Sequence, residues 1–145
     1  KEVSWMPSYG PEMRGGTASC SVTISDESVG SPIIDNPDVL IVMNLPSLDK
    51  YEKTVKKGGV IFVDSTLIER KVVRDDVKVF YIPSTKIAQD MGTPNLANIV
   101  LLGKVLKECP EIGMDGMEEA LRKVVSKRPE MYETNMKAVE AGYNY

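Results

Sequence analysis

Residues 38–65 read DVLIVMNLPSLDKYEKTVKKGGVIFVDS. Two short apolar runs, residues 38–44 and 59–65, enclose a polar stretch with helical spacing and a Gly-Gly end. Continuous apolar runs of this length are typical of strands buried on both faces, as in a parallel sheet. We therefore expect a strand, a crossover helix at 46–59 and a second strand, which is the unit of an α/β fold with a mostly parallel sheet.

The same periodicities predict the remaining elements. They are strands at residues 3–6, 18–25 and 77–83 and helices at 93–108, 114–129 and 129–143. In the strand at 18–25 apolar residues alternate with Ser and Thr, which predicts one buried apolar face. The apolar stripe of the helix at 93–108 is too wide for one contact surface, so we expect it to face two layers or a partner.

Composition limits the classes of function. The chain has 145 residues, 42% of them hydrophobic, and a formal net charge of −3 with acidic and basic residues scattered. This predicts one globular domain without a charged patch for nucleic acid or an anionic membrane. The apolar runs are far shorter than the ~20 residues that cross a bilayer. We expect a soluble cytoplasmic protein.

The nucleophiles and metal ligands are few. The chain has two cysteines, Cys20 and Cys109, without a C-x-x-C spacing, and no histidine. Its thiolates therefore cannot build a zinc or iron–sulfur site, and the usual general base is missing. We expect both cysteines to be buried thiols, and we expect neither catalytic nor metal-binding residues in this chain alone.

Polar residues follow the three predicted parallel strands. In open α/β sheets ligands bind at the carboxyl edge of the strands, so Asn44, Ser65 and Ser84 form a candidate binding edge. The alternative is that Ser47, Ser65 or Ser84 caps a following helix, which is the commoner role of serine at such a position.

The turn at residues 6–21, MPSYGPEMRGGTASCS, concentrates Gly and Pro around Glu12 and Arg14. Arg14 with the amides of Gly15 and Gly16 is suited to an anion such as a carboxylate or a phosphate. The alternative is a rigid turn in which Glu12 and Arg14 are solvated or paired with each other. Neither a P-loop nor a Gly-x-Gly-x-x-Gly motif is present.

The segment SYGPEMRGGTASCSVTISDESVGSP, residues 8–32, resembles the signature of the γ subunit of 2-oxoacid:ferredoxin oxidoreductases. The same unit occurs as a domain of single-chain pyruvate:ferredoxin oxidoreductases. The similarity continues in residues 36–51, 82–103 and 135–145. Within the family, the loop and Ser31-Pro32 look closer to the 2-oxoglutarate and branched-chain 2-oxoacid members than to the pyruvate members, which favours 2-oxoglutarate.

The resemblance implies a three-layer α/β/α scaffold with a mostly parallel sheet, like the γ domain of pyruvate:ferredoxin oxidoreductase. It implies a subunit, inactive alone, of an enzyme that oxidatively decarboxylates a 2-oxoacid to an acyl-CoA and reduces ferredoxin. Thiamine diphosphate and Mg²⁺ would lie between partner subunits α and β, and [4Fe–4S] clusters on β or on a ferredoxin-like δ subunit. Coenzyme A is the co-substrate, and this chain would complete the coenzyme A side of the site.

The resemblance also assigns residues to a cofactor-binding or interface role. They are Gly10, Pro11, Glu12, Arg14, Gly15, Gly16 and Asn98. Arg14 would meet a phosphate of coenzyme A or a carboxylate of a partner subunit, and both roles stay open.

One family element is missing from the sequence. Family members begin with a Gly-rich strand–loop–helix upstream of this loop, so we expect residues 1–145 to form a single γ-type domain that lacks this N-terminal unit. The alternative function is a stand-alone α/β module that binds a small molecule.

Overall fold

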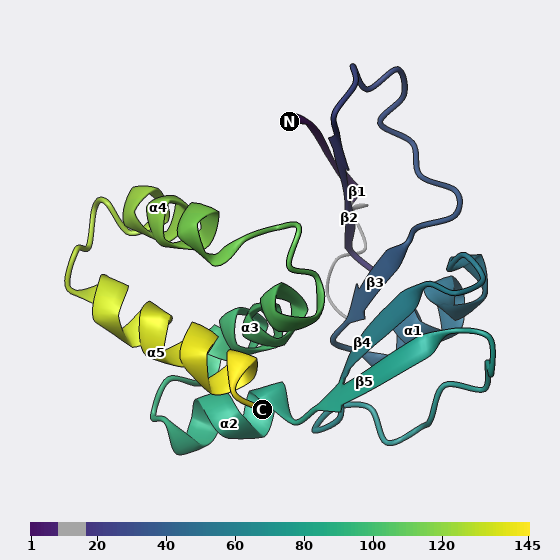
Figure 1. Ribbon diagram of the computed structural model, residues 1–145. Helices are drawn as coiled ribbons and strands as arrows, with labels where there is room; N and C mark the ends of the chain where they lie inside the picture. Colours follow the sequence, from purple (N-terminus) through teal and green to yellow (C-terminus); the bar gives the residue numbers. More distant parts are fainter. Residues whose placement is uncertain (9–16) are drawn as a thin grey trace. The chain divides into compact units, whose positions relative to one another are not determined.

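The computed structural model describes residues 1–8 and 17–145 (Figure 1). The chain divides into two compact units, and neither is continuous in sequence. Unit 1 comprises residues 1–61 and 72–79, and unit 2 comprises residues 62–71 and 80–145. The expected single γ-type domain over residues 1–145 stays a prediction.

The described residues form five strands and five α-helices. The strands are β1 Glu2–Ser8, β2 Ser19–Ser25, β3 Val39–Val42, β4 Val60–Asp64 and β5 Lys78–Ile82. The helices are α1 Leu45–Tyr51, α2 Ser84–Asp90, α3 Ala97–Glu108, α4 Met114–Val124 and α5 Met131–Tyr143, with 3-10 turns at Glu52–Thr54 and Pro94–Leu96. Strands β1 and β2 form an antiparallel pair, and a parallel sheet has the order β3-β4-β5. The predicted α/β class with its parallel sheet is confirmed.

The β1–β2 hairpin of unit 1 has the predicted alternation but the opposite exposure. Val3 lies opposite Ile24, and Trp5 lies opposite Val22. These four side chains are 48–67% exposed, whereas the Ser and Thr side chains on the other face of β2 are half-buried. Cys20 shares the exposed apolar face, so the prediction that both cysteines are buried is wrong for Cys20 and right for Cys109. Alternation predicts which residues share a face, but it does not predict which face is covered.

Helix α1 of unit 1 is shorter than the predicted helix at 46–59. Its N-cap is Asn44, whose side chain accepts a hydrogen bond from the backbone N–H of Ser47 at 2.8 Å, so Ser47 is not the cap. The 3-10 turn that follows ends at Thr54, and Val55 is extended; the carbonyl oxygen of Val55 accepts a hydrogen bond from Arg74. The end of this helical segment is thus bound by Arg74, a residue distant in the sequence.

The strands differ in burial. In β4 the residues from Ile61 to Asp64 are fully buried, as predicted. In β3 Ile41 is 46% exposed, so the prediction of burial on both faces is wrong for β3, which lies at the edge of the sheet. Residues 65–77, between β4 and β5, contain no helix.

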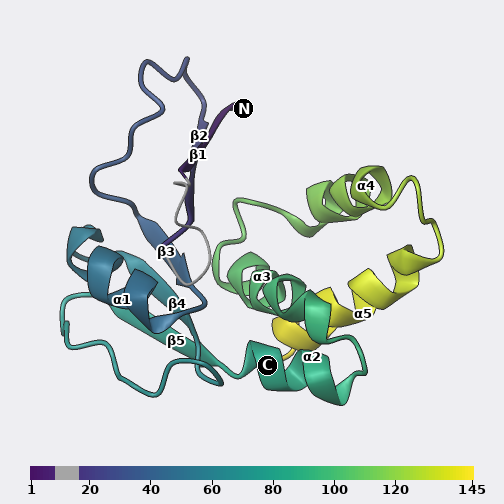
Figure 2. The same ribbon diagram turned by 180° about the vertical axis from the view of Figure 1, so that it is seen from behind.

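The helices of unit 2 pack around α3. Helix α3 contacts both α2 and α5, which agrees with the prediction that its wide apolar stripe faces two layers (Figure 2). The crossing of α3 and α5 is so close that a methyl group on Gly103 would overlap the carbonyl oxygen of Val139. Helix α4 contacts α5, where Leu121 packs with Leu106 and Val139.

Helix α4 buries less than its pattern predicts. Leu121 is its only buried residue, and the apolar Val124, three positions further along the helix, is 77% exposed. On its exposed surface, Lys123 Nζ and Glu119 Oε1 form an ion pair at 2.6 Å.

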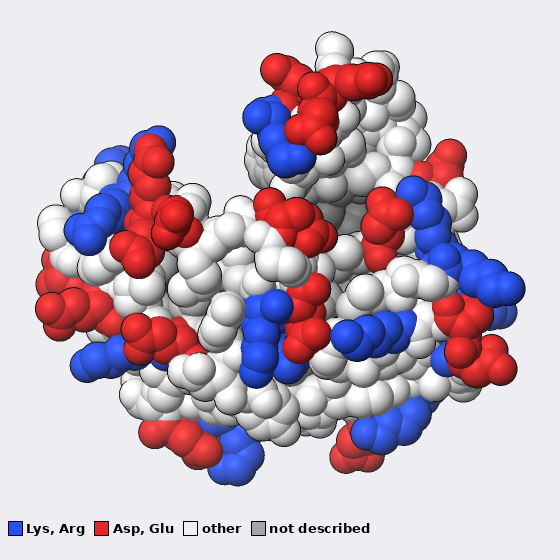
Figure 3. Space-filling view, viewed as in Figure 1, with Lys and Arg blue, Asp and Glu red and all other residues white. Residues whose placement is uncertain are grey.

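Charges of both signs alternate over the face of the molecule seen in Figure 3. No helix within residues 1–8 and 17–145 is long and apolar enough to cross a bilayer.

Candidate functional site

The predicted loop residues Gly10, Pro11, Glu12, Arg14, Gly15 and Gly16 lie outside the described residues. The strands on both sides of the loop are described. Ser8, the last residue of β1, lies opposite Ser19, the first residue of β2, so the two ends of the loop are joined by the hairpin ladder.

Helix α1 contacts the chain directly after this loop. The Tyr51 hydroxyl donates a hydrogen bond to Ser19 Oγ at 3.1 Å, and Lys50 Nζ donates to Thr17 Oγ1 at 3.3 Å. Lys50 Nζ also lies 5.0 Å from the centre of the Tyr51 ring. The hydrogen bond with Ser19, followed by that with Lys50 and its charge, lowers the pKa of Tyr51 below 10.0, against the opposing effect of burial. Sequence reasoning missed this pair, because its only signal is a polar dipeptide at a helix end.

A second polar cluster lies at the carboxyl ends of β4 and β5 in unit 2. The fully buried Asp64 carboxylate accepts hydrogen bonds from the backbone N–H of Thr66 at 3.0 Å and from the N–H of Thr85 at 3.2 Å. It also accepts a hydrogen bond from the Thr85 hydroxyl at 2.5 Å. Thr66 Oγ1 in turn accepts from the N–H of Lys86 at 3.1 Å. Asp64 and Thr66 thus satisfy N–H groups in the first turn of α2.

Neither Ser65 nor Ser84 caps a helix, and their predicted binding role stays a prediction. Ser84 begins α2 and is fully buried, and its hydroxyl has no hydrogen-bond partner among the described residues. It does not cap α2, because Asp64 and Thr66 take that role. Ser65 is half-buried, and its N–H donates to the carbonyl of Ile82 at 2.9 Å.

The two other predicted site residues, Asn44 and Asn98, lie on other elements than this cluster. Asn44 caps α1 in unit 1, whereas Ser65 and Ser84 belong to unit 2, so a site shared by these three residues stays a prediction. Asn98 is exposed in the first turn of α3.

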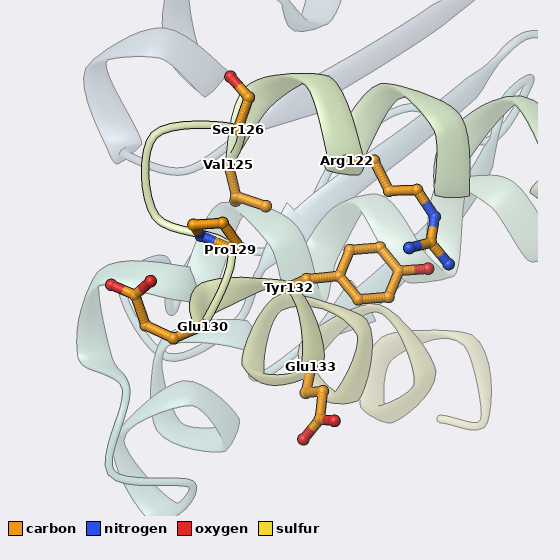
Figure 4. Close-up of a pocket in the computed structure, with 7 residues that line it drawn as sticks. All are labelled: Arg122, Val125, Ser126, Pro129, Glu130, Tyr132 and Glu133. Atoms are coloured by element: carbon orange, nitrogen blue, oxygen red, sulfur yellow. The ribbon is translucent and has the colours of Figure 1, made fainter.

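A pocket of about 560 Å³ lies between the end of α4 and the start of α5 (Figure 4). Its lining residues are Arg122, Val125, Ser126, Pro129, Glu130, Tyr132 and Glu133. The Arg122 guanidinium carbon lies 4.2 Å from the centre of the Tyr132 ring, so the guanidinium already makes a cation–π contact within the chain. The pocket contains none of the predicted site residues.

The described part of the chain contains no group of three or more Cys, Asp or Glu residues arranged to hold a metal ion. The chain as a whole has no histidine.

The family follows from comparison with known proteins. The family model described as pyruvate ferredoxin/flavodoxin oxidoreductase matches residues 1–145, which is the whole chain. The chain belongs to this oxidoreductase family. The predicted resemblance is thereby confirmed.

Two curated relatives in this family carry substrate names. The ketoisovalerate oxidoreductase subunit VorA of Methanothermobacter marburgensis is 37% identical over 150 residues, which cover 100% of this chain and 30% of VorA. The 2-oxoglutarate synthase subunit KorC of Methanocaldococcus jannaschii is 38% identical, over 99% of this chain and 76% of KorC. The chain thus spans less than a third of VorA and about three quarters of KorC.

A solved structure has the same fold. The γ subunit of a keto/oxoacid ferredoxin oxidoreductase from Geobacter sulfurreducens superimposes with a TM-score of 0.78 at 34% identity. The match covers 99% of this chain and 79% of that subunit. The fold of this oxidoreductase family member is therefore that of a γ subunit.

Proposed function

We propose that this chain is the γ-type part of a 2-oxoacid:ferredoxin oxidoreductase, in which it acts as a scaffold and completes the coenzyme A side of the active site. The supporting observation is its similarity, over nearly its full length, to the Geobacter γ subunit and to KorC. In this proposal the enzyme decarboxylates a 2-oxoacid, transfers the acyl group to coenzyme A and passes two electrons to ferredoxin.

The donor atoms of the chain support this division of labour. Without histidine, with Cys20 exposed on the hairpin and Cys109 buried, the side chains do not fit an iron–sulfur cluster. We assign thiamine diphosphate and Mg²⁺ to partner subunits α and β, and the [4Fe–4S] clusters to β or δ. The chain contributes shape and positioning, while the cofactors supply the redox chemistry.

We assign a cofactor-binding or interface role to the loop residues Gly10, Pro11, Glu12, Arg14, Gly15 and Gly16, and separately to Asn98. Arg14 offers a planar fork for a phosphate of coenzyme A or for a carboxylate of a partner subunit. Two similarities bear on the 2-oxoacid: KorC at 38% identity and VorA at 37%. We propose 2-oxoglutarate, because the chain matches most of KorC and because residues 8–32 resemble the 2-oxoglutarate and branched-chain members.

A second candidate is a stand-alone module that binds a small molecule at the strand ends. One observation favours it: the buried Ser84 hydroxyl, at the carboxyl edge of β5, has no hydrogen-bond partner among the described residues. A buried polar group of this kind is normally paired with protein, water or ligand.

The test is a native pull-down with this chain as bait, followed by a viologen-reduction assay that depends on a 2-oxoacid and on coenzyme A. Recovery of thiamine-binding and iron–sulfur subunits with turnover supports the subunit proposal, and the preferred 2-oxoacid identifies the substrate. An inactive monomer without partners contradicts it and favours the second candidate.

The role of Arg14 is tested in the assembled enzyme. If Arg14 contacts a phosphate, Arg14→Ala raises the KM for coenzyme A by about tenfold or more, since a charged hydrogen bond is lost. The matched control is Arg128→Ala, which removes an exposed arginine of unit 2. An unchanged KM excludes the phosphate contact and leaves the contact with a partner carboxylate.

A further inference from the structure

The β1–β2 hairpin presents an apolar face to solvent. The side chains of this face come from three cross-strand pairs, which are Val3 with Ile24, Trp5 with Val22, and Pro7 with Cys20. Val3 and Trp5 are 62% and 67% exposed. A contiguous exposed apolar surface marks an interaction site, whereas single exposed apolar residues are ordinary. We call these six residues the hairpin face.

The opposite face of the hairpin is mostly polar, although it is the more buried of the two. Ser19, Ser21 and Thr23 of β2 are half-buried. The buried Oγ of Ser4 in β1 has no hydrogen-bond partner among the described residues. Burial within this chain alone would favour the reverse arrangement, with the apolar side chains inside and the serines outside. Departures of this kind from the local rules are expected at functional positions, which indicates that another molecule covers the hairpin face.

The size of the hairpin face helps to identify that molecule. The exposed parts of Val3, Trp5, Val22 and Ile24 amount to roughly 400 Å² of accessible surface. Two copies of the chain joined through this face alone would bury roughly 800 Å², which is less than the ~1,200 Å² of a stable interface. A larger partner, whose interface continues beyond the hairpin face, meets this requirement.

The border of the hairpin face is acidic. Beyond Val3 and Ile24 the two strands end in an ion pair between Lys1 Nζ and Asp26 Oδ1 at 2.7 Å, which neutralises the lysine. Glu2 and Glu27, next to this pair, are exposed and form no ion pair with another described residue. The sequence from residue 17 to residue 49 has five acidic residues and no Lys or Arg. A surface complementary to this face is therefore apolar and bordered by Lys or Arg.

We propose that the hairpin face docks a partner subunit of the oxidoreductase through an apolar surface bordered by basic residues. The identity of the partner as a subunit of this enzyme rests on the proposed function. Trp5 is the central anchor, because buried aromatic side chains carry much of the binding energy of protein interfaces. Glu2 and Glu27 form the acidic rim.

Hydroxyl-radical footprinting tests whether the hairpin face is covered. Trp5 is the only tryptophan of the chain, and mass spectrometry locates its oxidation. We expect its oxidation rate to fall by about fivefold or more from the isolated chain to the assembled enzyme, as for a side chain at the centre of an interface. Equal rates in the two states overturn the proposal. Protection of Trp5 in an isolated chain that sediments as a dimer also overturns it, in favour of a second copy.

A double variant tests the energetic role of the face. Trp5→Ser combined with Val22→Ser is expected to raise the Kd for the remaining subunits by about tenfold or more. The melting temperature of the isolated chain is expected to stay unchanged, because both side chains are exposed. Val124→Ser, at a 77% exposed position on α4, is the matched control and is expected to leave the Kd unchanged. An unchanged Kd in the double variant overturns the proposal.

Charge reversal tests the basic border of the partner. Glu27→Lys is expected to raise the Kd by about three- to tenfold at low ionic strength, and the effect is expected to shrink as salt is added. Glu111→Lys is the matched control, because it reverses an exposed carboxylate of unit 2. Binding that is unchanged or stronger in Glu27→Lys overturns the proposed chemistry of the partner surface.

The experiments separate this inference from the proposed function. Suppose that thiamine-binding and iron–sulfur subunits are recovered with turnover, while the oxidation of Trp5 and the Kd of the double variant stay unchanged. The inference then fails and the proposed function stands. If no oxidoreductase subunit binds the chain, both fail.

Discussion

Gly142 on α5 lies directly against the backbone carbonyl of Val100 on α3. A methyl group at position 142 would overlap this carbonyl oxygen, and backbone cannot move aside as a flexible side chain can. We expect Gly142→Ala to lower the free energy of unfolding by about 3 kcal/mol or more, as measured by urea denaturation.

The control for this substitution is Gly116→Ala in α4, where an added methyl meets nothing within 4 Å. Alanine is the better helix former, so we expect this variant to gain about 0.5–1 kcal/mol. Equal effects of the two substitutions would contradict the close helix crossing.

The Asp64 carboxylate joins the end of β4 to the start of α2. Asp64→Ala leaves the N–H groups of Thr66 and Thr85 without their acceptor, and we expect a loss of about 3 kcal/mol of stability. Asp38→Ala removes an exposed ion pair with Lys56 and is expected to cost less than about 0.5 kcal/mol. Denaturation curves of both variants give the loss in the free energy of unfolding. Similar losses would mean that the hydrogen bonds of Asp64 contribute no more to stability than the exposed ion pair does.

The Arg74–Asp76 pair makes stability depend on pH at the acidic end. Hydrogen bonds and charge from Arg74 hold the pKa of Asp76 below its usual 3.8. A carboxyl whose pKa is lower in the folded protein contributes stability at pH values above its unfolded-state pKa. It loses that contribution as the pH falls through its folded-state pKa. We expect wild type to have a higher melting temperature than Asp76→Asn at neutral pH, and we expect the difference to shrink as the pH falls below 3.8. A difference that is constant with pH would rule out the ion pair as its cause.

The lowered pKa of Tyr51 has a spectroscopic consequence. The difference between the ultraviolet titrations of wild type and Tyr51→Phe is expected to show one phenol that ionises below pH 10.0. Lys50→Met removes a cation that favours the phenolate and is expected to move that titration upward. A difference curve centred on the usual tyrosine value would show that the contact with Ser19 does not form.

The exposed apolar face of the hairpin predicts dye binding by the isolated chain. Trp5 and Val22, 67% and 50% exposed, lie opposite each other on this face. Replacing both by Ser is expected to remove on the order of half of the fluorescence of a bound hydrophobic dye. Val124→Ser, at a 77% exposed position on α4, is the control and is expected to change it little. Equal losses of dye fluorescence in the two variants would mean that the dye does not bind preferentially to this face of the hairpin.

Local patterns in the sequence predicted the elements that depend on local interactions. Strand β4 and helix α3 follow from continuous apolar residues and from a wide helical stripe. The other features depend on contacts with residues that are distant in the sequence. Arg74 binds the carbonyl oxygen of Val55 just after the helical segment that follows α1. Asp64 at the end of β4 and Thr66 just after it bind N–H groups in the first turn of α2. Predictions that used only neighbouring residues failed at these two places.

Of the candidate site, only the loop motif could be predicted from the sequence. The Arg-Gly-Gly loop is visible in the sequence, but the contacts of Thr17 and Ser19 with α1 bring together residues more than thirty positions apart. No periodicity encodes such contacts. Likewise, nothing in the sequence distinguishes the exposed Asn98 from the buried Ser84 as a candidate ligand.

Because the two cysteines differ in exposure, the reactivity of one thiol can be used to follow one surface of the protein. Cys20 lies on the exposed apolar face of the hairpin, while Cys109 is enclosed. A thiol-reactive dye added to the native chain will therefore label one position without any engineered cysteine. The labelling rate then records, in real time, whether another molecule has covered that face.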